Sequence, residues 1–215
     1  MPIVLSLLIL ILLPAGAIAD GHTSSMQTIQ VAVYPVLHTD FSKLIVSIEP
    51  ENEKPGKRVV LQRVGGKESS SFDLFTTEGE VQLLTALDLV NAPKTINLKL
   101  SLPATTLDYQ SLTSPALLFK IIYANKQDLV LVGLTPSIKT LWKETITQKS
   151  VKTPNRPGST PGFETVEMRF EKGDKPLMDI VLLQAALPSK EDTDQIPGPP
   201  LTLLYQFEND TYIKK

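Results

Sequence analysis

The chain has 215 residues, with 21 basic and 23 acidic side chains, a formal net charge of −2 and no cysteine. The absence of cysteine excludes a thiol nucleophile, a thiolate metal site and a disulfide. The nearly neutral charge balance argues against a nucleic-acid partner, which would require clustered Lys and Arg.

Residues 1–19 have the pattern of a cleavable signal peptide. An apolar run from Ile3 to Leu13 is followed by Pro14, and the small side chains of Ala17 and Ala19 fit cleavage after residue 19. No Lys or Arg precedes the run, so only the α-amino group supplies a positive charge there. The run is shorter than the roughly 20 residues that cross a bilayer. We therefore expect a secreted, extracellular protein with no transmembrane segment in its mature chain.

Alternation of apolar and polar side chains recurs through the rest of the chain and predicts short β-strands. It is clearest at 95–102, at 166–171, where Val166, Met168 and Phe170 share a face, and at 201–207. Weaker signals lie at 28–34, 43–48, 57–64, 80–87, 117–123, 128–134, 140–147 and 178–186. The last of these is almost continuously apolar, so a buried strand or a short helix fits it, and we favour the strand.

About eleven short strands separated by turn residues are typical of a β-sandwich. We predict an all-β chain with one or two Greek-key sandwich units. A Pro-containing stretch at 102–115 indicates a crossing between a first sandwich, residues 20–104, and a second, residues 115–215, which carries a Pro/Gly-rich loop at 148–162. One larger sandwich with the same projecting loop is the alternative.

Residues 44–102 contain a series of short motifs. The turn Pro50-Glu51-Asn52 follows an apolar strand, and further along Gly79 and the pair Leu87-Asp88 lead into the alternating residues 96–100. This order resembles that of a cadherin repeat. The resemblance implies an immunoglobulin/cadherin-like Greek-key sandwich and a role in cell adhesion.

A second resemblance covers part of the same segment. Residues 80–102 are similar to the C-terminal module of fibulin-type matrix proteins, in which a hairpin, a Pro-containing turn and an alternating strand follow one another. Asn91-Ala92-Pro93 has the form of that turn. This resemblance implies association with the extracellular matrix, so both resemblances point to an extracellular protein or matrix partner.

The cadherin resemblance also implies calcium ligands. Glu51 matches the acidic residue of the family's first motif, and Asp88 matches half of its Leu-Asp-x-Glu motif, whose Glu is absent here. A further acidic cluster, Glu191, Asp192 and Asp194, precedes a Pro-rich turn in the manner of a linker between repeats. Since calcium prefers about six to eight oxygen ligands, these five residues are the candidate ligands, and no other cofactor is expected. A solvated acidic loop is the alternative for the cluster.

The sequence carries no recognisable catalytic apparatus. His22 and His38 do not have the spacing of a metal-binding motif, and the chain has no Gly-x-Ser-x-Gly elbow. We therefore assign no catalytic residue and expect non-catalytic binding. The alternatives are a secreted hydrolase whose catalytic residues are dispersed along the chain and a carrier of a small ligand.

Three single residues carry further predictions. Asn209 begins the sequon Asn-Asp-Thr and is the candidate glycosylation site of a secreted chain. Trp142, the sole tryptophan, is expected to fill a core. Gly79 is expected to supply the positive φ of a tight hairpin.

Overall fold

The protein is an all-β molecule, as predicted. The structure is a computed structural model, and it describes residues 27–35, 43–50, 56–64, 70–96, 98, 106–149, 151–152, 159–160, 162–187 and 199–215. The described residues form strands and turns and contain no helix. The predicted signal peptide, residues 1–19, lies outside them.

One of the two main sheets has five strands in the order β4-β3-β2-β1-β7. Neighbouring strands are antiparallel except β1 and β7, which are parallel. The strands are β1 (Gln27–Pro35), β2 (Lys43–Pro50), β3 (Lys57–Val64), β4 (Ser70–Thr77) and β7 (Thr106–Leu112).

The other main sheet has nine strands, in the order β16-β15-β14-β13-β10-β9-β8-β5, with β6 beside β13. Neighbours are antiparallel and mostly consecutive in the chain, as in a meander, and Greek-key connections are not confirmed. The strands are β5 (Glu80–Asp88), β6 (Thr95–Ile96), β8 (Pro115–Ile122), β9 (Lys126–Gly133), β10 (Lys139–Gln148), β13 (Phe163–Glu171), β14 (Asp179–Ala186), β15 (Leu201–Glu208) and β16 (Thr211–Lys214). Within the predicted loop 148–162, β11 (Val151–Lys152) pairs with β12 (Ser159–Thr160).

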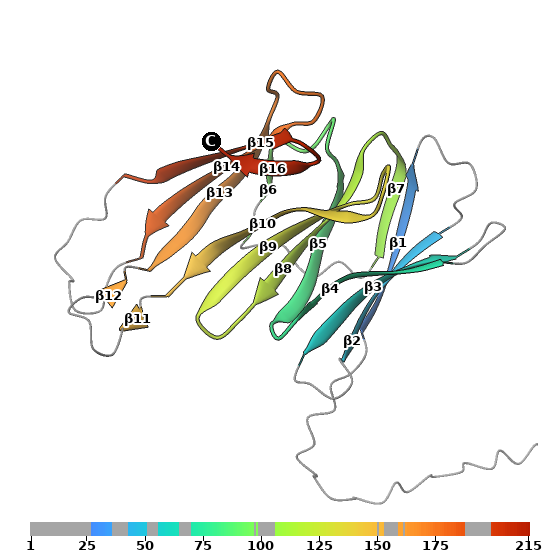
Figure 1. The fold of residues 1–215 in the computed structure, drawn as a ribbon, viewed down its shortest axis with the longest axis horizontal. Coiled ribbons are helices and arrows are strands. Elements are labelled where there is room, and N and C mark those ends of the chain that lie inside the picture. Colours follow the sequence, from blue (N-terminus) through green and yellow to red (C-terminus); the bar gives the residue numbers. More distant parts are fainter. Residues whose placement is uncertain are drawn as a thin grey trace, which may run out of the picture.

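The nine-stranded sheet folds over on itself between β10 and β13. These strands pair through two residues each, and further along β6 takes the place of β10 beside β13. The end of the sheet returns to β10, because the Thr211 hydroxyl donates to the Leu141 carbonyl at 2.7 Å and Lys139 Nζ lies 3.0 Å from the Asp210 carboxylate. Figure 1 shows β13 to β16 on one side of β8 to β10, and the five-stranded sheet on the other.

Strands β5, β8, β9 and β10 form a middle layer with a hydrophobic core on each face. Towards the five-stranded sheet lies the inter-sheet core, which includes Leu44, Val46, Ile48, Val59, Leu61, Val81, Leu83, Leu117, Phe119, Ile121, Val130 and Val132. Towards β13 to β16 lies the fold-over core, which includes Leu87, Leu118, Leu129, Leu131, Trp142, Met168, Phe170, Ile180, Leu182, Leu203, Tyr205 and Tyr212. Burial on both faces explains why β8 and β9 are almost continuously apolar.

The first predicted unit, 20–104, contributes two strands to the sheet of the second, 115–215. β5 and β6 come from the first predicted unit, but they pair with β8 and β13 of the second. β7 occupies the stretch that was predicted to cross between the units, and it pairs with β1. Whether each unit folds by itself remains a prediction.

A β-bulge changes the predicted pattern of β13. The register shifts between Thr165 and Glu167, so that Val166, which was predicted to face a core with Met168, is 46% exposed. Thr165 is buried instead, and its hydroxyl has no hydrogen-bond partner in the described structure. The prediction for Val166 was wrong because a bulge interrupts the strict alternation of a strand.

The predicted role of Gly79 was also wrong. It connects β4 and β5, which lie in different sheets, and its φ lies outside the left-handed region. Space requires glycine there, because an added Cβ would lie 2.5 Å from Ile121 Cγ2 and 3.0 Å from the Ile122 carbonyl oxygen. Gly79 therefore permits the close approach of this connection to the end of β8.

Candidate functional site

Strand β4 is an open edge of the five-stranded sheet. β3 pairs with one side of β4, and none of the described strands pairs with its other side. An open edge presents backbone N–H and C=O groups that can pair with another chain. At the other ends of the two sheets, β7 contacts β5 and β16 contacts β10 (Figure 1).

The composition of β4 leaves this edge unprotected. Its sequence, Ser-Ser-Phe-Asp-Leu-Phe-Thr-Thr, contains one charged residue and neither Lys nor Pro. By contrast, β16 has four residues, and Lys214 and Lys215 stand at its end. A short strand and Lys side chains are devices that block pairing at a sheet edge, and β4 has neither, but it does carry a β-bulge at Leu74, which is a third such device.

Three apolar side chains of β4 lie at the rim of the inter-sheet core. Phe72, Leu74 and Phe75 are partly buried and pack against it. The rings of Phe75 and Phe119 meet edge to face, with centroids 5.3 Å apart and an interplanar angle of 83°. The guanidinium carbon of Arg63 lies 5.6 Å from the centroid of the Phe72 ring. The edge therefore combines an apolar rim with backbone groups that pair with none of the described strands.

A β-bulge at Leu74 sets the faces of β4. Phe75 pairs with Val59 and Asp73 pairs with Val60, so Leu74 has no residue opposite it on β3. In a regular strand, residues three apart lie on opposite faces. Because of the bulge, Phe72 and Phe75 both face the core. Asp73 is exposed on the outer face.

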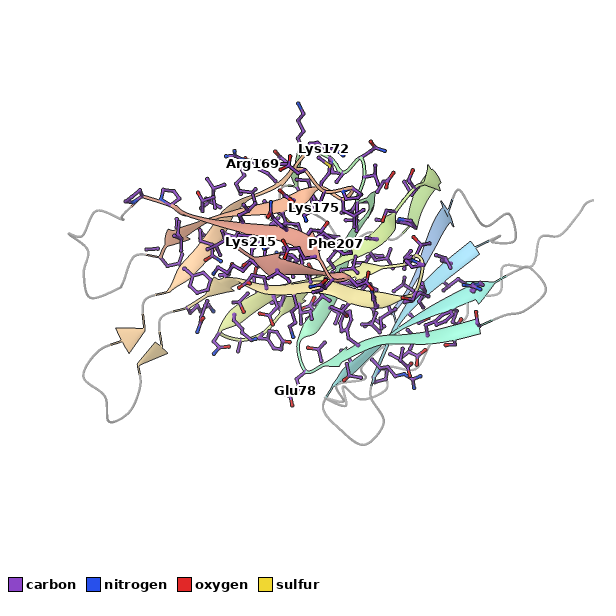
Figure 2. All side chains as sticks on the ribbon, turned by 45° about the horizontal axis from the view of Figure 1, so that its top comes forward. Glu78, Arg169, Lys172, Lys175, Phe207 and Lys215 are labelled. Atoms are coloured by element: carbon purple, nitrogen blue, oxygen red, sulfur yellow. The ribbon has the colours of Figure 1, made fainter. Side chains whose placement is uncertain are left out.

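The middle and the C-terminal end of the edge are held by side-chain contacts. On the outer face, Arg58 donates to Asp73 Oδ1 from Nε at 2.9 Å and from Nη2 at 2.6 Å. At the end of β4, the hydroxyls of Thr77 and Tyr123 lie 2.7 Å apart in a hydrogen bond. Figure 2 shows Glu78, the next residue, projecting away from the protein.

Asp88, a predicted calcium ligand, joins two turns. Its carboxylate accepts hydrogen bonds from the backbone N–H of Ser114 at 2.9 Å, of Val90 at 3.2 Å and of Thr113 at 3.2 Å, and from the Asn91 side chain at 3.4 Å. Partial burial opposes ionisation, but these donors together outweigh it and hold the pKa of Asp88 below its ordinary value. Asp88 thus ties the turn after β5 to the turn before β8.

The other four predicted calcium ligands, Glu51, Glu191, Asp192 and Asp194, lie outside the described residues. Within the part of the chain that the structure covers, no group of three or more His, Cys, Asp or Glu side chains is placed to hold a metal ion. Calcium binding therefore stays a prediction.

Asn209, the predicted glycosylation site, lies at the tip of the hairpin between β15 and β16. Asn209 and Asp210 have φ values of 47° and 68°, as in a two-residue type I′ turn, and both are exposed. Glycosylation itself stays a prediction. Trp142 is 4% exposed in the fold-over core, which confirms its predicted role.

Asp128 is a buried carboxylate whose charge is balanced by two nearby lysines. It lies 2.9 Å from Lys126 Nζ and 3.7 Å from Lys143 Nζ, and it accepts a hydrogen bond from the Thr145 hydroxyl at 2.9 Å. A buried charge is tolerated when it is paired and hydrogen-bonded in this way. These contacts account for Asp128 as a structural residue.

Comparison with family models, with curated proteins and with solved structures finds no match for this chain. Among the described residues, no helix is long and apolar enough to cross a membrane. No binding role was predicted for residues 70–77, which form β4. Its lack of Lys and Pro is visible in the sequence, but the position of β4 at an edge depends on the strand order, which period-two alternation does not reveal.

Proposed function

We propose that the chain is a secreted, non-catalytic binding protein that engages an extracellular protein or matrix partner at the open edge of β4. The observation that carries this proposal is the combination, on one strand, of partly buried Phe72, Leu74 and Phe75 with an outer side that pairs with none of the described strands. An extended segment of the partner would add to the sheet beside β4. Its side chains would then cover the apolar rim.

The backbone groups and the side chains of the β4 edge would contribute differently to binding. Backbone hydrogen bonds along an added strand supply affinity, and the side chains that alternate along it supply specificity. The anchoring of β4 through Arg58 and Tyr123 reduces the ordering that binding would require. The resemblance of residues 44–102 to a cadherin repeat supports adhesion as the form of this binding.

Leu74→Lys tests the proposal, because a Lys at the rim opposes burial under an added strand. Ile213→Lys on β16 is the matched control, since Ile213 is 37% exposed on a strand that already carries Lys. The purified protein and both variants are titrated onto surfaces coated with laminin, fibronectin or collagen. We expect the wild type and Ile213→Lys to bind at least one surface equally, and Leu74→Lys to bind it at least tenfold more weakly.

Two results would contradict the proposal. One is the failure of the wild type to bind any of the surfaces or another extracellular protein, a second copy of the chain included, and the other is equal binding by Leu74→Lys. Far-UV circular dichroism and thermal unfolding establish that each variant is folded before it is compared.

A further inference from the structure

The sequence of β4 is self-complementary when it is read from both ends. Two hydroxyl residues and a Phe precede the central pair Asp73-Leu74, and a Phe and two hydroxyl residues follow it. If two copies of β4 lie antiparallel about this centre, Phe72 of one copy stands opposite Phe75 of the other. Hydroxyl residues stand opposite hydroxyl residues on both sides. Aromatic pairs and Ser/Thr pairs are favourable cross-strand neighbours.

The bulge at Leu74 makes the faces of the two copies agree on either side of the central pair. A twofold axis perpendicular to a sheet leaves each face on its own side, so residues that stand opposite each other must share a face. Phe72 and Phe75 meet this condition only because the bulge turns both of them towards the core. The central pair does not meet it, since Asp73 is exposed on the outer face and Leu74 packs against the core. Ser71 and Thr76, the neighbouring pair, are both exposed on the outer face.

The charges of the edge are compatible with this pairing. Asp73 is the one charged residue of β4, and in this register it stands opposite Leu74 of the other copy rather than opposite a second Asp73. Its carboxylate is also paired with Arg58 of its own chain at 2.6 Å. Like charges directly opposite each other would destabilise a strand pair. In this register the two Asp73 residues are offset by one residue across the twofold axis, and each carboxylate is paired with Arg58 of its own chain. In Figure 2 the basic residues Arg169 and Lys172 lie on the other side of the molecule from Glu78 at the end of β4.

We infer that a second copy of this chain is the partner that binds at β4. The inference rests on the proposed function, since it uses the same edge. Two β4 strands pair antiparallel about a twofold axis and join the five strands of each copy into one continuous sheet. Each copy covers the apolar rim of the other, so the contact is closed and does not continue into a fibre.

The absence of cysteine allows a direct test of the register. Ser71→Cys and Thr76→Cys are made as two separate proteins, and both positions are exposed. In the inferred pair, Ser71 of one copy and Thr76 of the other are directly opposite, with Cα atoms about 4.5–5.5 Å apart, which a disulfide spans. The two Ser71 residues of the pair, like the two Thr76 residues, are offset by five residues along the strands, which is about 17 Å. A disulfide cannot span that distance.

We expect an equal mixture of the two variants to give at least tenfold more disulfide-linked dimer under mild oxidation than either variant alone, as measured on a non-reducing gel. Sedimentation of the cysteine-free protein is expected to show dimers for the wild type and monomers for Leu74→Lys. Equal cross-linking by one variant alone, no cross-linking by the mixture, or a monomeric wild type would overturn the inference.

The two proposals fail in distinguishable ways. If the mixture gives no cross-link but the wild type binds a matrix surface and Leu74→Lys does not, the second copy is wrong as the partner and the binding function stands. If neither cross-linking nor surface binding is observed, both proposals are wrong.

Discussion

Asp88 is a residue whose charge connects parts of the chain that are distant in sequence. Its carboxylate receives backbone N–H groups from Thr113 and Ser114, at the start of β8, and from Val90 in its own turn. Hydrogen bonds to an ionised group are stronger than those between neutral groups. We therefore expect Asp88 to contribute to stability in its ionised form.

Asp88→Asn is expected to lower the free energy of unfolding by about 1 kcal/mol at neutral pH, because the amide loses the charge and turns an NH₂ towards N–H donors. The pKa of Asp88 is lowered in the folded state from 3.8. Its stabilisation is therefore complete above that unfolded-state value and is lost as the pH falls through the folded-state pKa. Urea unfolding at neutral pH and at about pH 3 measures this change, and the difference between wild type and variant should shrink in acid.

Asp73→Asn is the matched control for that experiment. Asp73 is paired with Arg58, but its side chain is 66% exposed, and exposed pairs contribute less than about 1 kcal/mol. An effect of Asp88→Asn no larger than that of Asp73→Asn, or one independent of pH, would show that the hydrogen bonds to Asp88 do not stabilise the fold.

For single residues, the sequence predicted the environment where the side chain strongly prefers one kind of environment. Trp142 was placed in a core from its size alone, and it is there. Asp88 was singled out, but its partners Thr113 and Ser114 are 25 and 26 residues away, and no local pattern links them. Gly79 was assigned a turn conformation because the sequence does not show that Ile121 approaches it.

At the scale of elements, strands with regular alternation or long apolar runs were predicted and others were not. The predicted strands 43–48, 57–64 and 178–186 correspond to β2, β3 and β14, and the last is a strand rather than a helix. The bulge in β4 breaks its alternation, and β16 has only four residues, so neither was predicted as a strand. Within the best predicted strand, 95–102, the described strand is Thr95–Ile96.

The connection between β4 and β5 provides a prediction at the same scale. Gly79→Ala is expected to lower the free energy of unfolding by about 1–3 kcal/mol, since the added methyl group must displace Ile121, which is 1% exposed in the inter-sheet core. Thermal unfolding measures the change. Glu78→Ala, at the exposed neighbouring position, is the control and is expected to change stability by less than about 0.5 kcal/mol. Equal stability of Gly79→Ala and the wild type would mean that Ile121 moves aside freely.

At the scale of the whole molecule, the middle layer couples the two cores. Leu117 belongs to the inter-sheet core, and its neighbour Leu118 belongs to the fold-over core. The sequence indicated one or two sandwiches without deciding between them, because a continuous apolar run such as β8 does not reveal which sheets lie on its two faces. The shared layer predicts that both cores unfold together.

Leu117→Ala tests this coupling, because the sole tryptophan, Trp142, reports on the opposite core. The substitution is expected to lower the free energy of unfolding by about 2–5 kcal/mol. Tryptophan fluorescence and far-UV circular dichroism should give the same lowered urea midpoint. Leu201→Ala, at a residue that is 61% exposed, should leave the midpoint nearly unchanged. A fluorescence midpoint that Leu117→Ala does not move would show that the two cores unfold independently.

The pairing of β1 with β7 and of β5 with β8 also has a consequence for synthesis. A chain that emerges with its N-terminus first exposes β1 to β5 well before β7 and β8 are available. During this interval the first half of the protein has incomplete sheets and exposed apolar faces, and such a state is prone to aggregate with other chains. If the chain is secreted, as we propose, this interval falls on the far side of the membrane, and productive folding would depend on how quickly residues 106–133 follow the earlier strands out.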